Sequence, residues 1–164
     1  MAVRFNADEI FEIAERIEIN GAKFYSNTAK KFDGAVKETL EKLASMEHEH
    51  RIIFATMRST LSNAEAEDAL YDPDEDVKKY LHAIADGKVF TINDDPSTLL
   101  NGAETTYEIL RMAIGLEKDS IIFYLGMKEM VPEKLGKGKI EQIIQEEKSH
   151  ILILSDLLKT LCNS

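Results

Sequence analysis

Two short motifs in this chain combine a carboxylate and an imidazole at helical spacing. Glu47 and His50 form one Glu-x-x-His motif, and Glu147 and His150 form a second one 100 residues later. Residues three or four positions apart lie on the same face of a helix, so each motif can direct both side chains at one point. Carboxylate and imidazole groups together form a ligand set that suits iron or manganese.

Two further glutamates extend this repeat. Glu18 and Glu117 lie 99 residues apart, and each is followed seven positions later by a tyrosine, Tyr25 or Tyr124. Four buried carboxylates would be costly without partners, whereas two divalent cations would balance their charge. We therefore expect a two-metal site, with the tyrosines hydrogen-bonding to ligand carboxylates across the bundle. The predicted ligands are Glu18, Glu47, His50, Glu117, Glu147 and His150.

Five helical segments are predicted to position these residues. Their expected ranges are about 7–31, 35–61, 75–86, 97–130 and 137–161, within a single domain spanning residues 1–164. Asn6 with Glu9 is expected to cap the first helix, and Asp74 is expected to cap the short one. A long helix spans roughly 40 Å, so a short loop cannot return the chain along it. The prediction is therefore an all-α, ferritin-like four-helix bundle: two antiparallel hairpins joined by a long crossover that contains the short helix.

Each predicted long helix carries its ligands within an apolar stripe at helical spacing. The polar ligands replace apolar residues at core positions, so we expect them to face the interior near the middle of each helix. Glu146 precedes a ligand and lies four residues before His150, so it could contact a ligand, but it is expected instead to be a solvated flanking residue. The stripe positions around the ligands are Phe11, Ala14 and Gly21; Val36, Leu40, Leu43, Phe54, Met57 and Leu61; Ala103, Leu110, Ile114 and Ile121; and Ile140, Ile143, Leu154, Leu157 and Leu161.

Composition excludes several other classes of protein. The net charge of −10 argues against nucleic acid as a partner, because a basic surface is expected there. Cys162 is the single cysteine, which rules out an intrachain disulfide or a four-cysteine iron site and fits a reducing, cytoplasmic compartment. No apolar run approaches the length of a membrane span, and the first residues lack the apolar core of a signal peptide.

Four segments, EINGAKFY from Glu18, EHEH from Glu47, EKDSIIFY from Glu117 and EKSH from Glu147, resemble the erythrin domain of rubrerythrins, within the ferritin-like superfamily. The resemblance covers essentially the whole chain. It implies two iron ions, with manganese or zinc as further candidates. It also implies that Glu47 and Glu147 bridge both metals. Each of the remaining ligands would then bind a single metal; these are Glu18, His50, Glu117 and His150.

The sequence departs from rubrerythrins in two respects. Rubrerythrins carry an additional glutamate three residues after the third-helix ligand, where this chain has Ser120, matching Gly21 in the first half. The redox-linked ligand exchange associated with that glutamate is therefore not carried over. The paired cysteines of a rubredoxin-like domain are also absent from the sequence. We expect electrons to come from a separate donor, such as a rubredoxin-like protein, or from Fe(II) itself.

The resemblance implies a non-haem di-iron oxidoreductase that reduces hydrogen peroxide or O₂, and it favours a homodimer. Two alternatives stay open at this point. One is a ferritin-type ferroxidase for iron storage, which would need a hollow multi-subunit shell. The other is a structural metal-bound bundle without turnover, which would hold zinc tightly and show no oxidation chemistry.

Overall fold

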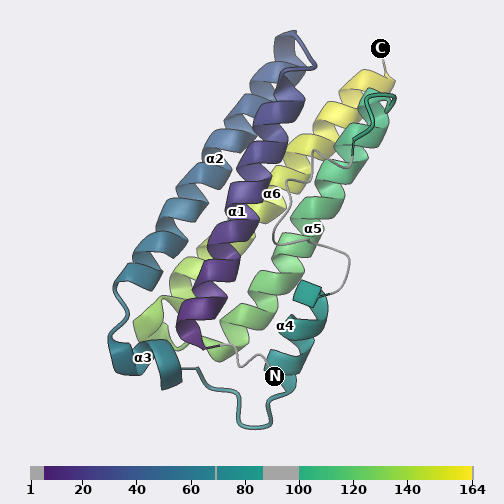
Figure 1. The fold of residues 1–164 in the computed structure, drawn as a ribbon. Helices are drawn as coiled ribbons and strands as arrows, with labels where there is room; N and C mark the ends of the chain where they lie inside the picture. Colours follow the sequence, from purple (N-terminus) through teal and green to yellow (C-terminus); the bar gives the residue numbers. More distant parts are fainter. Residues whose placement is uncertain (1–5, 69, 87–99, 164) are drawn as a thin grey trace.

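Four long helices dominate the computed structural model, which describes residues 6–68, 70–86 and 100–163 (Figure 1). They are α1 (Ala7–Ala29), α2 (Gly34–Ser59), α5 (Thr106–Met130) and α6 (Lys137–Cys162). Helices α1 and α2 form one antiparallel hairpin and α5 and α6 form another, with their turns at opposite ends of the bundle (Figure 1). The predicted all-α four-helix bundle with two hairpins and a crossover is confirmed.

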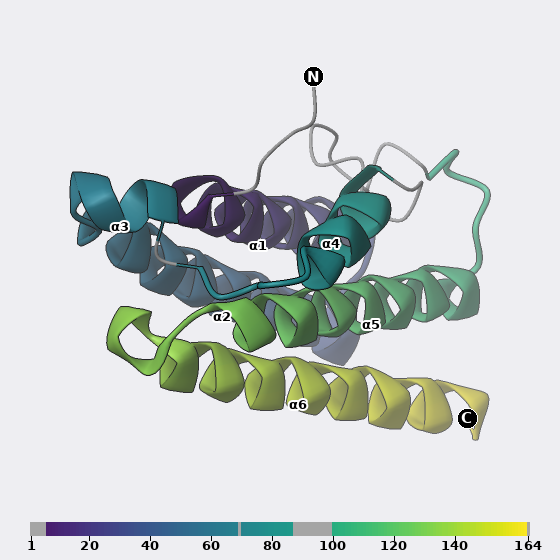
Figure 2. The same ribbon diagram turned by 90° about the horizontal axis from the view of Figure 1, so that it is seen from below.

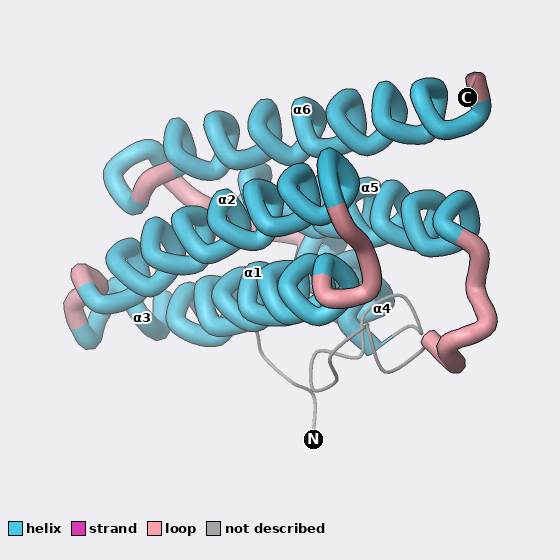
Figure 3. The backbone as a smooth tube through the Cα atoms, turned by 90° about the horizontal axis from the view of Figure 1, so that it is seen from above, coloured by secondary structure: helices cyan, strands magenta, loops and turns pink. Residues whose placement is uncertain are grey.

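The two hairpins pack face to face. Helix α1 contacts α5 as well as α2, and α6 contacts α2 as well as α5. Views from below and from above the bundle show the four long helices running side by side, with α1 and α2 on one side and α5 and α6 on the other (Figures 2 and 3). All four helices therefore turn one face toward a common interior, as their apolar stripes predicted.

The crossover contains two helices within its described part, α3 (Asn63–Asp68) and α4 (Asp76–Asp86), whereas the sequence analysis predicted one. Helix α3 was missed because the residues between the predicted helices 35–61 and 75–86 were left outside any helix. Ser62 caps α3, since its backbone N–H donates to Glu65 Oε2 (3.0 Å) and its hydroxyl accepts from the Glu65 N–H (3.2 Å).

Helix α4 is capped differently from the prediction. The carboxylate of Asp72, not that of Asp74, accepts the backbone N–H groups of Val77 (3.4 Å) and Lys78 (2.8 Å). Helix α4 packs on α5 (Figure 2). Leu81 of α4 is fully buried. A Cβ on Gly126 would lie 2.7 Å from the Leu81 side chain, so glycine at this position permits the close approach of the two helices.

The start of the third long helix was also predicted wrongly. Residues 97–99 lie outside the described part of the chain, residues 100–105 are not helical, and α5 begins at Thr106. Thr105 and Glu108 form a reciprocal capping box, which fixes the start, and Ala103 is exposed before the helix. The capping box of Asn6 with Glu9 at the start of α1 is confirmed.

The remaining predicted helix ends differ little from the observed ones, which fall at Ala29, Gly34, Ser59 and Cys162. In the last turn of α6 the predicted stripe is displaced. Leu158 is buried there, while Leu157 is half-buried and Leu161 is exposed. The buried face of this turn therefore continues from Leu154 to Leu158 and not to the predicted Leu157.

Two apolar clusters fill the interior. One includes Phe11, Phe54 and Ile143, and the other includes Phe24 and Leu110. In each long helix the residues of the two clusters are separated by a short stretch that contains the predicted ligands. The bundle therefore has a polar layer in its middle, covered by apolar residues at both ends. None of the described helices is long and apolar enough to cross a membrane.

Candidate metal centre

The polar layer consists of the six predicted ligands, which the structure brings together from all four long helices. Their relative exposures range from 0% to 4%, so none of them is solvated. Charged side chains are rarely buried this completely without partners. The six residues are Glu18 on α1, Glu47 and His50 on α2, Glu117 on α5, and Glu147 and His150 on α6.

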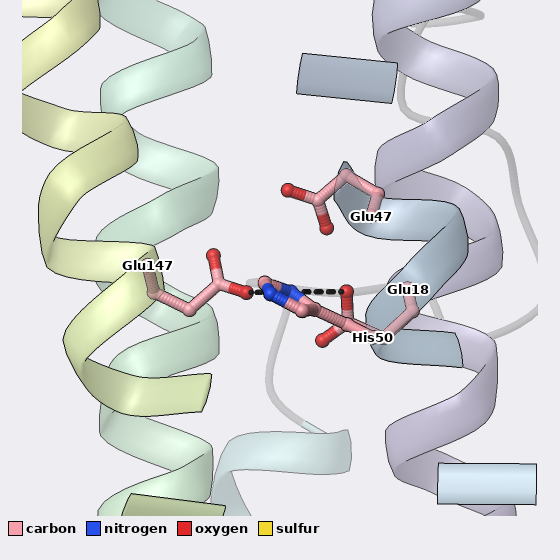
Figure 4. A group of neighbouring side chains, drawn as sticks. All are labelled: Glu18, Glu47, His50 and Glu147. Carbon is pink, nitrogen blue, oxygen red and sulfur yellow. Dashed lines mark ion pairs between the residues drawn. The ribbon is translucent and has the colours of Figure 1, made fainter. Parts of the chain in front are cut away.

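The six residues form two overlapping groups of four. One group is Glu18, Glu47, His50 and Glu147, which Figure 4 shows converging from α1, α2 and α6. In the second group Glu117 and His150 replace Glu18 and His50. Within each group, one potential ligand atom from every residue lies within 4.8 Å of the others. Glu47 and Glu147 belong to both groups, which is the position expected of bridging carboxylates.

The two imidazole rings present the same nitrogen to the carboxylates. His50 Nδ1 lies 2.8 Å from Glu147 Oε1 and 3.4 Å from Glu18 Oε2. His150 Nδ1 lies 3.0 Å from Glu47 Oε1 and 3.4 Å from Glu117 Oε1. The rings are nearly parallel, with an interplanar angle of 14° and centroids 5.5 Å apart. Each half of the chain therefore contributes one imidazole nitrogen to one of two adjacent positions.

The donor atoms that face this centre lack hydrogen-bond partners. Buried polar atoms are nearly always hydrogen-bonded, so a cluster of exceptions needs an explanation. Several of these atoms are close to one another without hydrogen-bond geometry, and all are of types that bind iron or manganese. The residues present therefore fit divalent metal ions. Among the described residues, the unpartnered atoms include Glu18 Oε2, Glu47 Oε1, His50 Nδ1, both oxygens of Glu147, and His150 Nδ1.

Burial and mutual repulsion raise the pKa values of three of the four carboxyl groups. Burial, followed by the neighbouring charge of Glu147, raises the pKa of Glu117 to about 8 and also raises the pKa of Glu18. Burial and the charges of Glu117 and Glu18 raise the pKa of Glu47 well above its ordinary value. Without metal, these carboxyl groups therefore hold protons more strongly than a solvated glutamate does, and bound cations would displace those protons.

The pKa of Glu147 is shifted in the opposite direction. Burial and the charge of Glu47 act to raise it, but contacts with Glu117, His150 and His50 outweigh them and lower the pKa. Burial acts to lower the pKa of His50, yet its contacts with Glu147 and Glu18 raise that pKa to about 11. Glu147 is therefore the one carboxyl group among the four whose pKa is lowered.

The two predicted tyrosines contact the glutamates of the opposite hairpin. The Tyr25 hydroxyl on α1 donates to Glu117 Oε1 on α5, and the Tyr124 hydroxyl on α5 donates to Glu18 Oε1 on α1. Burial and the adjacent carboxylates raise the pKa of both phenols well above its ordinary value, so both remain proton donors. These hydrogen bonds orient the two glutamates and tie the hairpins together.

Glu146 has a contact that sequence reasoning did not favour. Its side chain is only 38% exposed, and its Oε2 atom lies 2.7 Å from His50 Nε2, the ring nitrogen that faces away from the other carboxylates. Glu146 is therefore partly solvated, but the expectation of a merely flanking residue missed its contact with His50. The available signal was that Glu146 directly precedes the ligand Glu147, but only the packing of α6 against α2 brings it to His50.

Gly21 and Ser120 occupy corresponding positions, three residues after Glu18 and Glu117. A Cβ on Gly21 would lie 2.8 Å from Glu47 Oε2, so the missing side chain makes room for a shared carboxylate. The Ser120 hydroxyl donates to the backbone oxygen of Leu116, 3.1 Å away, within its own helix. Neither position supplies a carboxylate to the centre.

Comparisons with known proteins agree with this geometry. The family model described as rubrerythrin matches residues 9–104 of the chain. The chain is also similar to a crystal structure of a Thermotoga maritima protein described as a candidate ferritin-like diiron-carboxylate protein. The two share 26% sequence identity with a TM-score of 0.68, over 94% of this chain and 95% of that one. No protein with a curated description matches the sequence.

Proposed function

The chain belongs to the rubrerythrin family, and on that premise we propose that it is a non-haem di-iron oxidoreductase that reduces hydrogen peroxide. The observation that carries the proposal is the pair of overlapping, fully buried ligand groups that share Glu47 and Glu147. A single metal would not need the duplicated glutamate and histidine. A purely structural ion would not need shared carboxylates between two adjacent positions.

In this proposal each half of the chain holds one iron through its own residues. Glu18 and His50 belong to one position, Glu117 and His150 to the other, and the two shared glutamates bridge them. Two ferrous ions would supply the two electrons that, with two protons, convert hydrogen peroxide into two molecules of water. Four carboxylates balance the charge of two divalent cations, which makes the buried centre close to neutral.

The surrounding residues control access and orientation. The apolar clusters at both ends exclude bulk water, which strengthens the electrostatic interactions at the centre. Tyr25 and Tyr124 keep their protons on the phenol oxygens and hold Glu117 and Glu18 in position through hydrogen bonds. We propose that electrons for further turnovers come from a separate donor protein.

An anaerobic titration of the metal-free protein with Fe(II), followed by hydrogen peroxide, tests this function. We expect two Fe(II) per chain and rapid formation of a ferric absorbance after peroxide addition, with a slower response to O₂. Glu47→Ala is the matched control, because it lacks a shared carboxylate and should give no such signal. Two irons that remain inert to both oxidants, or no Fe(II) uptake, would overturn the proposal. Fast oxidation by O₂ in an assembly large enough to enclose a mineral would indicate a ferroxidase instead.

A further inference from the structure

Within the described part of the chain, only one of the two ligand histidines has a hydrogen-bond partner on its outer nitrogen. His50 Nε2 lies 2.7 Å from Glu146 Oε2. His150 Nε2 is buried, and none of the residues that the structure describes forms a hydrogen bond with it. The two halves thus supply the same donor atoms to the centre but hold their imidazoles differently.

The position that carries this partner differs between the two halves of the sequence. Glu146 precedes Glu147 on α6, and the residue that precedes Glu47 on α2 is Met46, 100 positions earlier. Met46 is half-buried, as Glu146 is. A thioether is only a weak hydrogen-bond acceptor, so Met46 cannot do for His150 what a carboxylate does for His50.

An acceptor on the outer nitrogen changes how an imidazole binds a metal. It holds the proton on Nε2, leaves the Nδ1 lone pair free for the metal, and fixes the plane of the ring. It also makes the ligand nitrogen more basic. Loss of such a partner typically costs about 10- to 100-fold in metal affinity.

Much of the surrounding environment is matched between the two positions. Each position has one glutamate of its own, and each of these glutamates accepts a hydrogen bond from a tyrosine of the opposite hairpin. Both positions share Glu47 and Glu147. The outer partner of the histidine is therefore a difference with a direct effect on ligand strength.

We propose that the two metal positions differ in affinity, and that Glu146 makes the position ligated by His50 the tighter one, which fills first. Glu146 is thus a positioning residue that acts through His50 and does not itself bind metal. This inference rests on the proposed two-metal function. It assigns an order of loading to a centre whose ligand set is otherwise duplicated.

Reciprocal substitutions at the two corresponding positions test the order of loading. The metal-free full chain is titrated with Co²⁺ and followed by calorimetry and visible absorption, in the wild type, Glu146→Met and Met46→Glu. The wild type should bind two ions in two steps. Glu146→Met should raise the dissociation constant of the first step by about 10- to 100-fold, whereas Met46→Glu should lower that of the second step and leave the first within about twofold.

The shared glutamates would weaken binding of a second ion even at two identical positions, so a two-step curve alone is not diagnostic. The variants separate the two causes, because mutual repulsion is common to all of them. Glu146→Gln adds a finer control: its amide oxygen still accepts a hydrogen bond, so its first step should lie between those of wild type and Glu146→Met. Thermal unfolding of each metal-free variant checks that the fold is retained.

The possible outcomes distinguish this inference from the function on which it rests. If the wild type binds fewer than two ions, both the two-metal function and the order of loading are overturned. If it binds two ions but Glu146→Met leaves the first step unchanged, or weakens only the second step, the order of loading alone is wrong. A first step weakened by Glu146→Met, together with a second step strengthened by Met46→Glu, supports the inference.

Discussion

The α1–α2 hairpin and the α5–α6 hairpin contribute the same chemical groups to the centre but support them differently. Each provides one glutamate, one Glu-x-x-His motif and one tyrosine that donates to the other hairpin. Around these groups the halves diverge: Gly21 corresponds to Ser120, and Met46 corresponds to Glu146. The donor atoms are duplicated, while their immediate neighbours are not.

This difference shows which features a two-metal centre requires twice. Each ion needs a full set of donor atoms at close range, so the ligand residues recur in both halves. The supporting contacts need only orient those ligands, and different residues can do this. Gly21 does it by leaving room for Glu47, and Glu146 does it by accepting a hydrogen bond from His50.

The largest effect is expected where the halves meet, at the shared carboxylates. Glu47→Ala removes a ligand from both groups and should abolish stable binding of two ions, whereas Glu18→Ala removes a ligand from only one group and should spare the other. Metal analysis of the reconstituted proteins measures the number of ions per chain. Two ions retained by Glu47→Ala would contradict the bridging assignment.

A smaller effect is expected from filling the space at Gly21. In Gly21→Ala the new Cβ would force the flexible Glu47 carboxylate to move, because its Oε2 would otherwise lie only 2.8 Å away. The fold should tolerate this change, since alanine favours a helix over glycine by roughly 1 kcal/mol. Metal affinity, measured by Co²⁺ titration, should nevertheless fall by about 10-fold or more, on the scale of other changes that misplace a ligand.

Gly115→Ala is the matched control for Gly21→Ala. Gly115 also lies within a long helix, but a Cβ there would have no neighbour within 4 Å. This variant should gain similar helix stability and keep wild-type metal affinity. Equal metal affinities in the two variants would show that the space at Gly21 is not needed by the carboxylate.

Removing the hydroxyl of each tyrosine in turn tests whether the two halves contribute equally to the stability of the metal-free protein. Tyr25→Phe and Tyr124→Phe each remove a hydrogen bond to a buried glutamate oxygen, and should lower the free energy of unfolding by about 1–3 kcal/mol. Because the two contacts match, the two losses should be similar. Urea unfolding of the metal-free variants measures them, and a markedly unequal pair of values would show that the hairpins are held together asymmetrically.

The smallest change is expected in the pH dependence of stability. It should have the same sign for Glu18 and Glu117, the glutamates that belong to one metal position each. Burial and Glu147 raise the pKa of Glu117 from 4.5 to about 8 in the folded state, and burial also raises that of Glu18. A raised folded-state pKa gives stability below pH 4.5 that is lost as the pH rises through 8. The metal-free protein should therefore melt a few degrees lower at pH 8 than at pH 5.

Thermal unfolding at several pH values, with and without Co²⁺, measures this effect. The bound ions replace the protons, so the metal-loaded protein should not lose stability over the same range. Glu117→Gln is neutral at every pH and should flatten the slope of the metal-free protein. A melting temperature that rises from pH 5 to pH 8 without metal would contradict the raised pKa values of these carboxyl groups.

Much of the fold was predictable because its signals are local and periodic. The stripes of α2 and α6 kept one face apolar over many turns, and the spacing of Glu47 from His50 fits that face. The errors occurred where two local signals compete. Ser62 can end one helix or cap the next, and only the reciprocal contact with Glu65 shows that it caps α3. The start of α5 was similarly set by one capping box, at Thr105.

The sequence by itself determined the residue types of the centre and the helix face that each occupies, because helical periodicity and the repeat at 99 to 100 positions are properties of the chain alone. Only the tertiary structure decided which oxygen lies beside which nitrogen. The contact of Glu146 with His50 and the room that Gly21 leaves for Glu47 depend on how α1, α2 and α6 pack, to within a few tenths of an ångström. No spacing along the chain encodes such distances between helices.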